Sequence, residues 1–593
     1  MNYILGINSF HADSSATLIK DGIVIAAVEE ERFNRMKHWA GFPYHSIEWC
    51  LNEAGISLHQ IKHLAVNCDP KANLKRKILT TLKNRPNPGF IYQRIKNKQD
   101  RVNIIPQLNK FFKNDLFEGE IHFIEHHRAH LASTFYTSQF TKSVTISVDG
   151  FGDFASAAVG FGNNSRINIS KKVFFPHSLG VFYTAITQFL GFPNYGDEYK
   201  VMGLAPYGID KYADEMKELL QLNDDGTFKL NLKYFKHANE KLNHQWTNCI
   251  PFVDIHYSNL FNNLFGEPVK KGEKITQKQM DIAKSAQIMY EKAFYNLLIS
   301  SYQEYDSENL CLSGGCGANS VANGKIKLKT PFKNIFIQAA TGDAGGALGA
   351  ALTVWHNIQP NRCAPLLNSY LGPSYTNQEI LEELDKKEIK NQLLKENCKV
   401  YQIGDKEIKT ENIFLQKIVK FITEGFVIGW FQGKMEWGPR ALGNRSIIGD
   451  PRRKDMKKIL NLKIKKRESF RPFAPSILRE RVKDWFTIDG DVPNMMQVFP
   501  IIESKRNLIP AVTHVDGTGR LQTVNAQQNK RYYKLIKEFE KQTNIPMLLN
   551  TSFNENEPIV NSPSEAINCF LRTKMDVLVL EDILIIREHK IDI

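Results

Sequence analysis

Two parts of this chain carry the same β-hairpin pattern, and the repetition constrains the fold more than any other feature. Residues 15–28 contain two β-rich runs around an Asp-Gly pair, which favours the positive φ angles of a type I′ turn. Residues 144–150 and 154–161 repeat the plan, with a Gly-Asn-Asn turn directly after them. A hairpin that returns in this way predicts an internally duplicated α/β domain.

Two glycine-rich turns follow further along the chain, at residues 309–315 and 341–351, and each leads toward a helix pattern. Glycine permits the backbone to approach a ligand closely, and helix N-termini attract anions. Together with the duplicated hairpins, these turns predict a nucleotide cleft of the actin and sugar-kinase type. The expected nucleotide contacts are Gly314, Gly315, Asn319 and Asn323.

The length of 593 residues is too great for a single hydrophobic core, so more than one domain is expected. Helix and strand patterns continue to residue 356, after which prolines and then a dense run of charges interrupt them. We predict an actin-like domain over residues 1–356, a linker over 357–397 and a second α/β domain over 398–593.

The composition is that of an ordinary globular protein with a formal net charge of +14. No apolar run approaches the roughly 20 residues of a membrane-spanning helix, and no leader precedes the first strand pattern. The eight cysteines show no paired spacing, which favours a reducing, cytoplasmic setting. A basic segment over residues 71–101 could dock an anionic partner, but a pair of solvated helices explains it equally well.

A histidine cluster in the first half of the chain points to a metal site. On a helix, His126 and His130 lie one turn apart on the same face. Asp149, at the end of a predicted strand, and Asp343, in a glycine turn, supply carboxylates. Two imidazoles with oxygen ligands suit Fe(II), Mn(II), Zn(II) or, less specifically, Mg(II), so we predict a divalent metal at these four residues. A hydrogen-bonded structural histidine cluster is the alternative.

Two basic clusters stand in the second half of the chain, at residues 438–446 and 465–473. Arginine offers phosphate a planar fork of donors, lysine adds a point charge, and glycine lets backbone N–H groups approach the oxygens. The prolines and glycines in both clusters would immobilise these cations. The pattern predicts a site for phosphate or a similar small anion, with a basic surface and structural turns as the alternative.

Several motifs occur together in the order found in one known family. They lie at residues 30–38, 126–130, 196–208, 438–446 and 549–560. Over nearly its whole length the chain resembles the O-carbamoyltransferases of nodulation-factor and antibiotic tailoring. The resemblance implies an N-terminal domain similar to the transferase that makes threonylcarbamoyladenosine in tRNA, and a C-terminal domain similar to threonylcarbamoyl-AMP synthase.

The resemblance also implies a reaction in two steps. The C-terminal domain would convert carbamoyl phosphate and ATP into carbamoyl-adenylate, pyrophosphate and phosphate. In the N-terminal domain, a hydroxyl of a sugar, glycan or secondary metabolite would attack the carbonyl carbon, and AMP would depart. The implied cofactors are ATP and Fe(II) or another divalent metal. Nucleic acid and membrane are not expected as partners, and the family leans toward homodimers.

The resemblance assigns a carbamoyl phosphate pocket by position. Lys465, Arg471 and Arg520 would hold carbamoyl phosphate. Arg440 and Arg445 would line the same basic cavity.

Three further residues receive implied roles. His11 would accept the proton of the acceptor hydroxyl, since an unperturbed imidazole titrates near neutrality. Asn550 and Ser552, together with Arg445, would contact the nucleotide.

Three other functions stay open at this point. One is a tRNA-modifying fusion enzyme that forms and transfers threonylcarbamoyl-adenylate. Another is an iron oxygenase built on two histidines and one carboxylate. The third is a non-catalytic ATP-binding module of the actin-like class.

Overall fold

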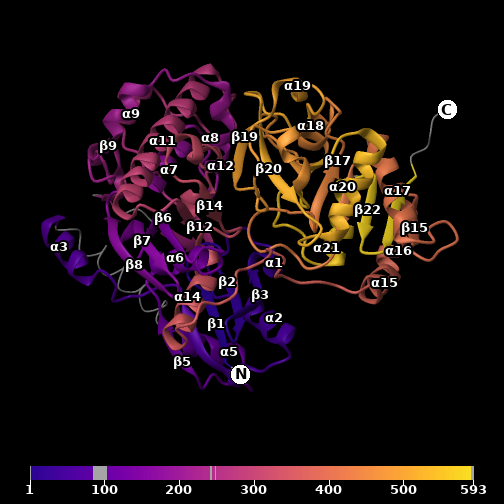
Figure 1. Cartoon of the computed structure of the whole chain (residues 1–593), viewed down its shortest axis with the longest axis horizontal. Helices are drawn as coiled ribbons and strands as arrows, with labels where there is room; N and C mark the ends of the chain where they lie inside the picture. Colours follow the sequence, from indigo (N-terminus) through magenta and orange to yellow (C-terminus); the bar gives the residue numbers. More distant parts are fainter. Residues whose placement is uncertain are drawn as a thin grey trace. The chain divides into compact units, whose positions relative to one another are not determined.

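A computed structural model describes residues 2–84, 103–238, 240, 244–247, 249–573 and 575–588. The chain divides into two compact units, Met1–Leu366 and Leu367–Ile593, each built of helices and sheets (Figure 1). The α/β class predicted from the sequence is confirmed in both. None of the described helices is both long and apolar enough to cross a membrane.

The first sheet of unit 1 has the order β3-β2-β1-β4-β5. Its strands are β1 (Tyr3–Asn8), β2 (Ser15–Lys20), β3 (Ile23–Glu29), β4 (Ile61–Val66) and β5 (Glu120–Phe123). The hairpin β2-β3 is antiparallel, as predicted, and β1 pairs antiparallel with β2 but parallel with β4. Strand β5 continues the parallel part.

The second sheet of unit 1 has the order β14-β13-β6-β7-β8. Its strands are β6 (Lys142–Gly152), β7 (Ala155–Asn163), β8 (Arg166–Phe174), β13 (Asn309–Ser313) and β14 (Asn334–Ile337). Three antiparallel strands are again followed by two parallel ones. The two sheets share one topology, so the duplication predicted from the hairpins is confirmed.

Helices α6 (His126–Phe135) and α14 (Asp343–Ile358) pack closely against each other in unit 1. The close approach is possible because glycine and alanine on α14 carry little or no side chain at the contact. A Cβ atom added at Gly349 would lie 1.7 Å from the Ala129 carbonyl oxygen, far inside contact distance. The small-residue pattern of α14 therefore brings its N-terminus close to α6.

The other helices of unit 1 cover its two sheets or lie in their connections (Figure 1). The long helix α11 (Gln277–Tyr305) packs along α7 (Leu179–Phe189) and α8 (Glu198–Leu204). The remaining elements are α1 (Glu31–Asn34), α2 (Tyr44–Ala54), α3 (Leu74–Asn84), α5 (Ile104–Phe111), α9 (Ala213–Leu219), β9 (Leu220–Leu222), β10 (Phe228–Leu230), β11 (His244–Thr247), β12 (Ile250–Val253), α10 (Phe261–Phe265), α12 (Ser320–Gly324) and α13 (Ile326–Lys329).

Unit 2 is built on one mixed sheet of the order β15-β23-β22-β16-β17-β21-β18-β20-β19. Its strands are β15 (Cys398–Gln402), β16 (Ile428–Phe431), β17 (Arg445–Gly449), β18 (Ala474–Leu478), β19 (Gln497–Pro500), β20 (Thr518–Val524), β21 (Met547–Ser552), β22 (Val577–Leu580) and β23 (Ile583–Arg587). Its helices are α15 (Asn377–Asp385), α16 (Lys387–Lys395), α17 (Glu411–Thr423), α18 (Met456–Lys458), α19 (Glu503–Arg506), α20 (Lys530–Thr543) and α21 (Pro563–Thr573).

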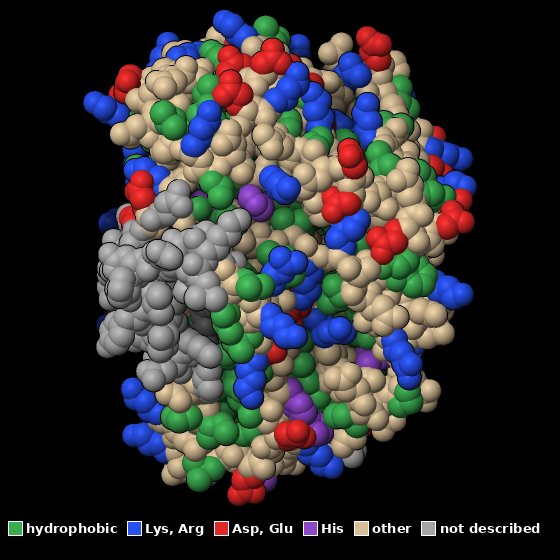
Figure 2. Space-filling view, turned by 90° about the vertical axis from the view of Figure 1, so that its left-hand side faces the viewer, with side chains coloured by type: hydrophobic (Ala, Val, Ile, Leu, Met, Phe, Trp, Pro, Cys, Tyr) green, Lys and Arg blue, Asp and Glu red, His purple; other side chains and the backbone are tan. Residues whose placement is uncertain are grey.

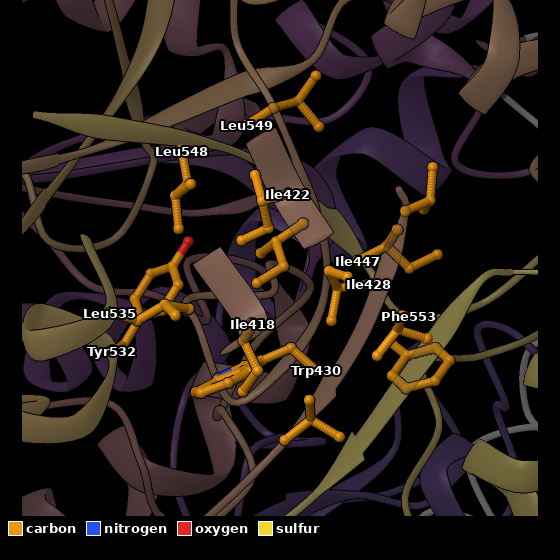
Figure 3. Packing of buried hydrophobic residues seen from close by; sticks show 14 of the residues in the cluster. Ile418, Ile422, Ile428, Trp430, Ile447, Tyr532, Leu535, Leu548, Leu549 and Phe553 are labelled. Atoms are coloured by element: carbon orange, nitrogen blue, oxygen red, sulfur yellow. The ribbon is translucent and has the colours of Figure 1, made fainter. Parts of the chain in front are cut away.

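Apolar side chains from the sheet and from several helices, α17 and α20 among them, fill the core of unit 2 (Figure 3). Ile418 of α17 and Leu535 of α20 lie near Trp430 of β16, and all three are fully buried. The Trp430 indole nitrogen donates a hydrogen bond of 2.8 Å to the carbonyl oxygen of Gly443. The core thereby fixes one end of the glycine- and arginine-rich loop that precedes β17.

Most of the segment expected as a linker, residues 357–397, is a folded part of unit 2. It contains α15 and α16, whose buried side chains belong to the core of unit 2: Ile380, Leu384, Ile389 and Leu393. Apolar residues four positions apart give each helix a buried stripe, although charges dominate the composition. Only the part before residue 367 belongs to unit 1.

The predicted basic segment at residues 71–101 lies mostly outside the described residues. Its described helix is α3. On the face of the molecule that Figure 2 shows, basic side chains lie among acidic and apolar ones. On that face the positive charge is thus interrupted by carboxylates, a mixture usual for a solvated surface.

Candidate functional sites

The four predicted metal ligands come together in unit 1. His126 and His130 lie on α6, Asp149 lies in β6, and Asp343 is the first residue of α14. One ligand atom from each residue lies within 4.8 Å of the others. The two histidines are buried, whereas the carboxylates keep a small exposed surface. The spacing predicted from the sequence thus becomes a compact group of nitrogen and oxygen ligands.

The distances within this tetrad fit a divalent cation. The Nε2 atoms of His126 and His130 lie 3.0 Å apart, and His130 Nε2 lies 3.0 Å from Asp149 Oδ2. Asp343 Oδ1 lies 3.5 Å from each Nε2 atom. Ligands bound at about 2.1 Å are separated by about 3.0 Å in octahedral and about 3.4 Å in tetrahedral coordination.

Glycines on β6 make room for the tetrad. A Cβ atom added at Gly152 would lie 2.0 Å from the His126 ring. Gly150 donates its backbone N–H to Asp149 Oδ1 at 2.7 Å, and the Ser178 hydroxyl contacts the Asp149 carbonyl oxygen at 3.0 Å. The local Asp-Gly-Phe-Gly sequence therefore holds the carboxylate while it leaves space for the imidazole.

The charges within the tetrad of His126, His130, Asp149 and Asp343 shift the pKa values of its members. Burial by itself lowers the pKa of His130, but hydrogen bonds and charge attraction from Asp149 and Asp343 raise it to about 9. Burial raises the pKa of Asp149, yet His126 and His130 hold that pKa well below its ordinary value. Two carboxylates thus demand positive charge at this position, which a protonated imidazole or a bound cation can supply.

His11 lies beside the tetrad, as predicted for a residue of the same cleft. Its Nδ1 atom lies 3.3 Å from Asp343 Oδ2, and its ring centroid lies 5.4 Å from that of His126. The side chain is partly buried. The imidazole is therefore held by a carboxylate of the tetrad.

A second aspartate–histidine pair in unit 1 was missed from the sequence. His38 Nδ1 lies 2.8 Å from Asp13 Oδ1, and against the effect of burial Asp13 raises the pKa of His38 to about 9. The Tyr195 ring lies 5.2 Å from the His38 ring. The signal was present, because His38 ends the motif at residues 30–38 and Tyr195 precedes the motif at 196–208.

The predicted glycine loop lies directly against the strand that carries Asp149. Gly314 has φ +87°, and a Cβ atom there would lie 2.2 Å from the Val148 carbonyl oxygen. A Cβ atom at Gly315 would lie 2.9 Å from Asp149 Oδ1. Both positions need glycine, and the loop borders the tetrad.

The two predicted asparagines support this loop from within the protein. Asn319 Oδ1 accepts the N–H of Ala322 at 3.1 Å and pairs with the Gln287 amide. Asn323 is buried, and its amide donates to the Gly317 carbonyl oxygen at 2.7 Å. The sequence predicted a nucleotide contact for Asn323, and the structure places its side chain beneath the loop.

In unit 2, an internal carboxylate organises the loop at residues 438–446. Glu436 Oε1 accepts backbone N–H groups from Leu442 at 2.7 Å, Asn444 at 2.8 Å and Arg445 at 3.1 Å. The sequence predicted that backbone donors of this loop face phosphate. Three of them are instead directed at Glu436, because a buried carboxylate needs the same donors.

Arg445 is separated from the predicted basic cavity. Its guanidinium is buried, donates to the carbonyl oxygens of Gln432 at 2.7 Å and Pro373 at 2.9 Å, and stacks 3.6 Å from the Phe431 ring centroid. Burial lowers the pKa of Arg445 to about 10. These contacts make Arg445 a structural cation of unit 2.

Four other arginines do converge. Burial, followed by repulsion from Arg440, Arg471 and Arg467, lowers the pKa of Arg520 well below its ordinary value. Arg471 also lies 3.5 Å from Glu468. The strongest charges acting on Arg520 are therefore other cations, an arrangement that a bound anion would stabilise. Arg467 belongs to the cluster although the sequence reasoning gave it no role.

Lys465 and Ser552, which received separate roles from the sequence, lie together inside the protein. The buried Lys465 Nζ donates to Ser552 Oγ at 3.3 Å, to Asn554 Oδ1 at 2.6 Å and to the Asn554 carbonyl oxygen at 2.7 Å. This ammonium therefore also holds the end of β21.

Asn550 connects β21 to the arginine-rich loop. Its buried amide donates to the Ala441 carbonyl oxygen at 3.2 Å and contacts Ser476 Oγ at 3.1 Å. Asn550 Oδ1 is buried and has no hydrogen-bond partner among the described residues. Asn550 thus fixes the backbone next to Arg440.

His514 was also missed. It precedes β20 and lies 3.1 Å from Thr518 Oγ1. Burial, reinforced by the charge of Arg520, lowers the pKa of His514 to about 4 despite the nearby Asp516. A neutral imidazole therefore borders the arginine cluster.

Comparisons with known proteins agree with the family resemblance of both the N-terminal and the C-terminal part of the chain. Residues 3–352 match the family model "Carbamoyltransferase N-terminus", and residues 419–587 match "Carbamoyltransferase C-terminus". Together the two matched segments cover most of the chain.

Two relatives match nearly the whole of this chain. Uncharacterized protein sll1178 of Synechocystis sp. is 41% identical over 98% of this chain and 96% of its own. Nodulation protein NolNO of Sinorhizobium fredii is 36% identical over 98% of this chain and 79% of its own. The crystal structure of T. kodakarensis HypF covers 60% of this chain and 48% of its own at 13% identity with a TM-score of 0.30, so the fold assignment rests on the sheet topology.

Proposed function

The chain belongs to the carbamoyltransferase family, and from that premise we propose that it is an ATP-dependent O-carbamoyltransferase. It takes the carbamoyl group from carbamoyl phosphate, carries it as carbamoyl-adenylate and transfers it to a hydroxyl of a sugar or secondary metabolite. The observation that supports this most strongly is the group of three arginines, Arg440, Arg467 and Arg471, around Arg520.

The proposed chemistry balances with one water. Hydrolysis of carbamoyl phosphate by this water yields carbamate and phosphate. A carbamate oxygen attacks the α-phosphorus of ATP, and pyrophosphate departs. The acceptor hydroxyl then attacks the carbonyl carbon and gives up its proton, while the bond from that carbon to the AMP oxygen breaks.

We assign adenylate formation to unit 2, which includes the domain predicted over residues 398–593. Arginine forks bind phosphate oxygens, and a partly buried group of cations, as here, attracts a polyanion more strongly than an exposed group does. Arg440, Arg471 and Arg520 would bind the donor phosphate, with Arg467 adjoining them. Lys465 would stabilise the wall of this pocket.

We assign carbamoyl transfer to the domain over residues 1–356. The tetrad of His126, His130, Asp149 and Asp343 would hold a divalent cation, Fe(II) by family resemblance. When bound, such a cation neutralises negative charge on the departing AMP phosphate. The glycine loop at Gly314 would admit the nucleotide phosphates close to its backbone.

A base near the tetrad would take the acceptor proton. His11 is the proposed base, because its ring is oriented by Asp343 and lies beside His126.

Pyrophosphate release tests the adenylating step. We expect release from ATP with carbamoyl phosphate and none with threonine plus bicarbonate. Arg471→Ala should abolish it, whereas the control Arg481→Ala, at a partly exposed arginine paired with Asp484 and Glu540, should not. Release only with threonine and bicarbonate would favour the tRNA-modifying alternative.

A further inference from the structure

A second group of metal-ligating side chains lies at the edge of the first sheet, away from the tetrad. The parallel register of β4 and β5 places His63 opposite Glu120 and Ala65 opposite His122. Side chains alternate between the faces of a strand, so both histidines and the glutamate project from the same face. Neither the predicted sites nor the proposed reaction uses these residues.

Their ligand atoms converge to metal-binding distances. His63 Nδ1 lies 3.0 Å from His122 Nε2. Glu120 Oε2 lies 3.7 Å from that His63 nitrogen and 3.6 Å from the His122 nitrogen. A single N–H···N hydrogen bond explains the first distance only. A common cation explains all three, because tetrahedral ligands at about 2.1 Å lie about 3.4 Å apart.

Burial at this cluster is graded in a way that suits ion entry. The histidine side chains are 20% and 24% exposed, whereas that of Glu120 is 69% exposed.

The cluster is separate from the tetrad. Asn67 follows β4 and approaches α14 near the tetrad, since a Cβ atom on Gly346 would lie 1.9 Å from the Asn67 amide. His63 lies four residues earlier on the strand, about 13 Å away at about 3.3 Å per residue. One ion cannot serve both sites.

We propose that His63, Glu120 and His122 bind a zinc ion that fastens the edge strand β5 to β4. Two imidazoles and one carboxylate are a ligand set that zinc accepts, and water can complete the coordination. Strand β5 is an edge strand of this sheet and pairs there with β4 alone. A cation across both strands therefore stabilises the sheet where backbone pairing stops. This inference is independent of the carbamoyl-transfer proposal.

Equilibrium dialysis of metal-stripped, untagged protein against zinc tests the site. The double variant His63→Gln/His122→Gln should bind one zinc fewer per chain than the wild type. The control His59→Gln, at an exposed histidine paired with Asp115, should bind as many as the wild type. An unchanged count in the double variant, or an equal loss in the control, would overturn the proposal.

A milder variant guards against misfolding of the double variant. Glu120→Gln changes an exposed side chain, and we expect it to weaken zinc binding at this site, whereas Glu118→Gln next to the strand should leave it unchanged. In the wild type, zinc should also slow amide hydrogen exchange in β5. Equal affinity in both glutamate variants, with no slowing in β5, would show that these residues do not bind zinc.

Discussion

His130 Nε2 lies 3.0 Å from the Asp149 carboxylate, although the two residues come from a helix and a strand. Each group shifts the pKa of the other toward the charged form. This pair is the centre of the proposed metal site. A substitution in this pair should therefore impair carbamoyl transfer and leave adenylate formation intact.

We predict that Asp149→Asn lowers the affinity for Fe(II) or Mn(II) by about a hundredfold or more. The amide retains one oxygen but loses the charge that attracts the cation. Pyrophosphate release should persist, while AMP formation in the presence of an acceptor should fall. Metal titration monitored by calorimetry measures the first effect, and Asp214→Asn at an exposed carboxylate is the control. Unchanged metal affinity would contradict the assignment of Asp149.

Two neighbouring glycines offer a matched test of the tetrad geometry. A Cβ atom at Gly152 meets the His126 ring at 2.0 Å, whereas one at Gly150 meets nothing within 4 Å. Gly152→Ala should lower the free energy of unfolding by about 1–3 kcal/mol and weaken metal binding, because the imidazole must move. Gly150→Ala should do neither. Urea unfolding and metal titration of both variants provide the comparison, and equal effects would contradict the described packing.

The His38–Asp13 pair predicts a pH dependence of stability. The pKa of His38 is raised from its ordinary 6.5 to about 9, so its contribution is fully present below pH 6.5 and is lost as the pH rises through 9. Solvent screening limits the size of this contribution, since the side chain is 33% exposed. Urea unfolding should show a smaller loss of stability over this window for His38→Gln than for the wild type. Parallel pH profiles would contradict the prediction.

Arg445 and Arg520 should respond in opposite ways to loss of charge. Arg445→Met removes hydrogen bonds to buried carbonyl oxygens and should cost about 2–3 kcal/mol of folding stability. Arg520→Gln relieves repulsion among arginines and should keep or raise stability by about 1 kcal/mol, yet abolish pyrophosphate release. Thermal unfolding and the release assay distinguish the two. A destabilised but active Arg520→Gln variant would contradict an anion-binding role.

Local patterns made much of the fold predictable. The Asp-Gly hairpin and its repeat are decided by neighbouring residues, so the duplicated sheets were accessible from the sequence. The tetrad was accessible too, because His126 and His130 are four residues apart on one helix. The approach of Asp343 depends on α14 packing against α6, which its small residues only suggested.

Long-range contacts decided the parts that the sequence did not reveal. Glu436 accepts the backbone donors of Leu442 and Asn444, and no motif indicates which acceptor a turn will face. Arg445 and Arg440 belong to the same short segment, yet only Arg440 joins the cations around Arg520. The amphipathic stripes of α15 and α16 were hidden by their charges, which led to the incorrect expectation of a linker.

The most direct test of the account is detection of the carbamoyl-adenylate itself. The Asp343→Asn variant should be incubated with ATP and carbon-13-labelled carbamoyl phosphate, then quenched and analysed by mass spectrometry. Because the transfer site is disabled while unit 2 is intact, labelled carbamoyl-adenylate should accumulate in step with pyrophosphate. If folded protein that binds ATP and carbamoyl phosphate yields no labelled adenylate, the proposed two-step reaction is contradicted.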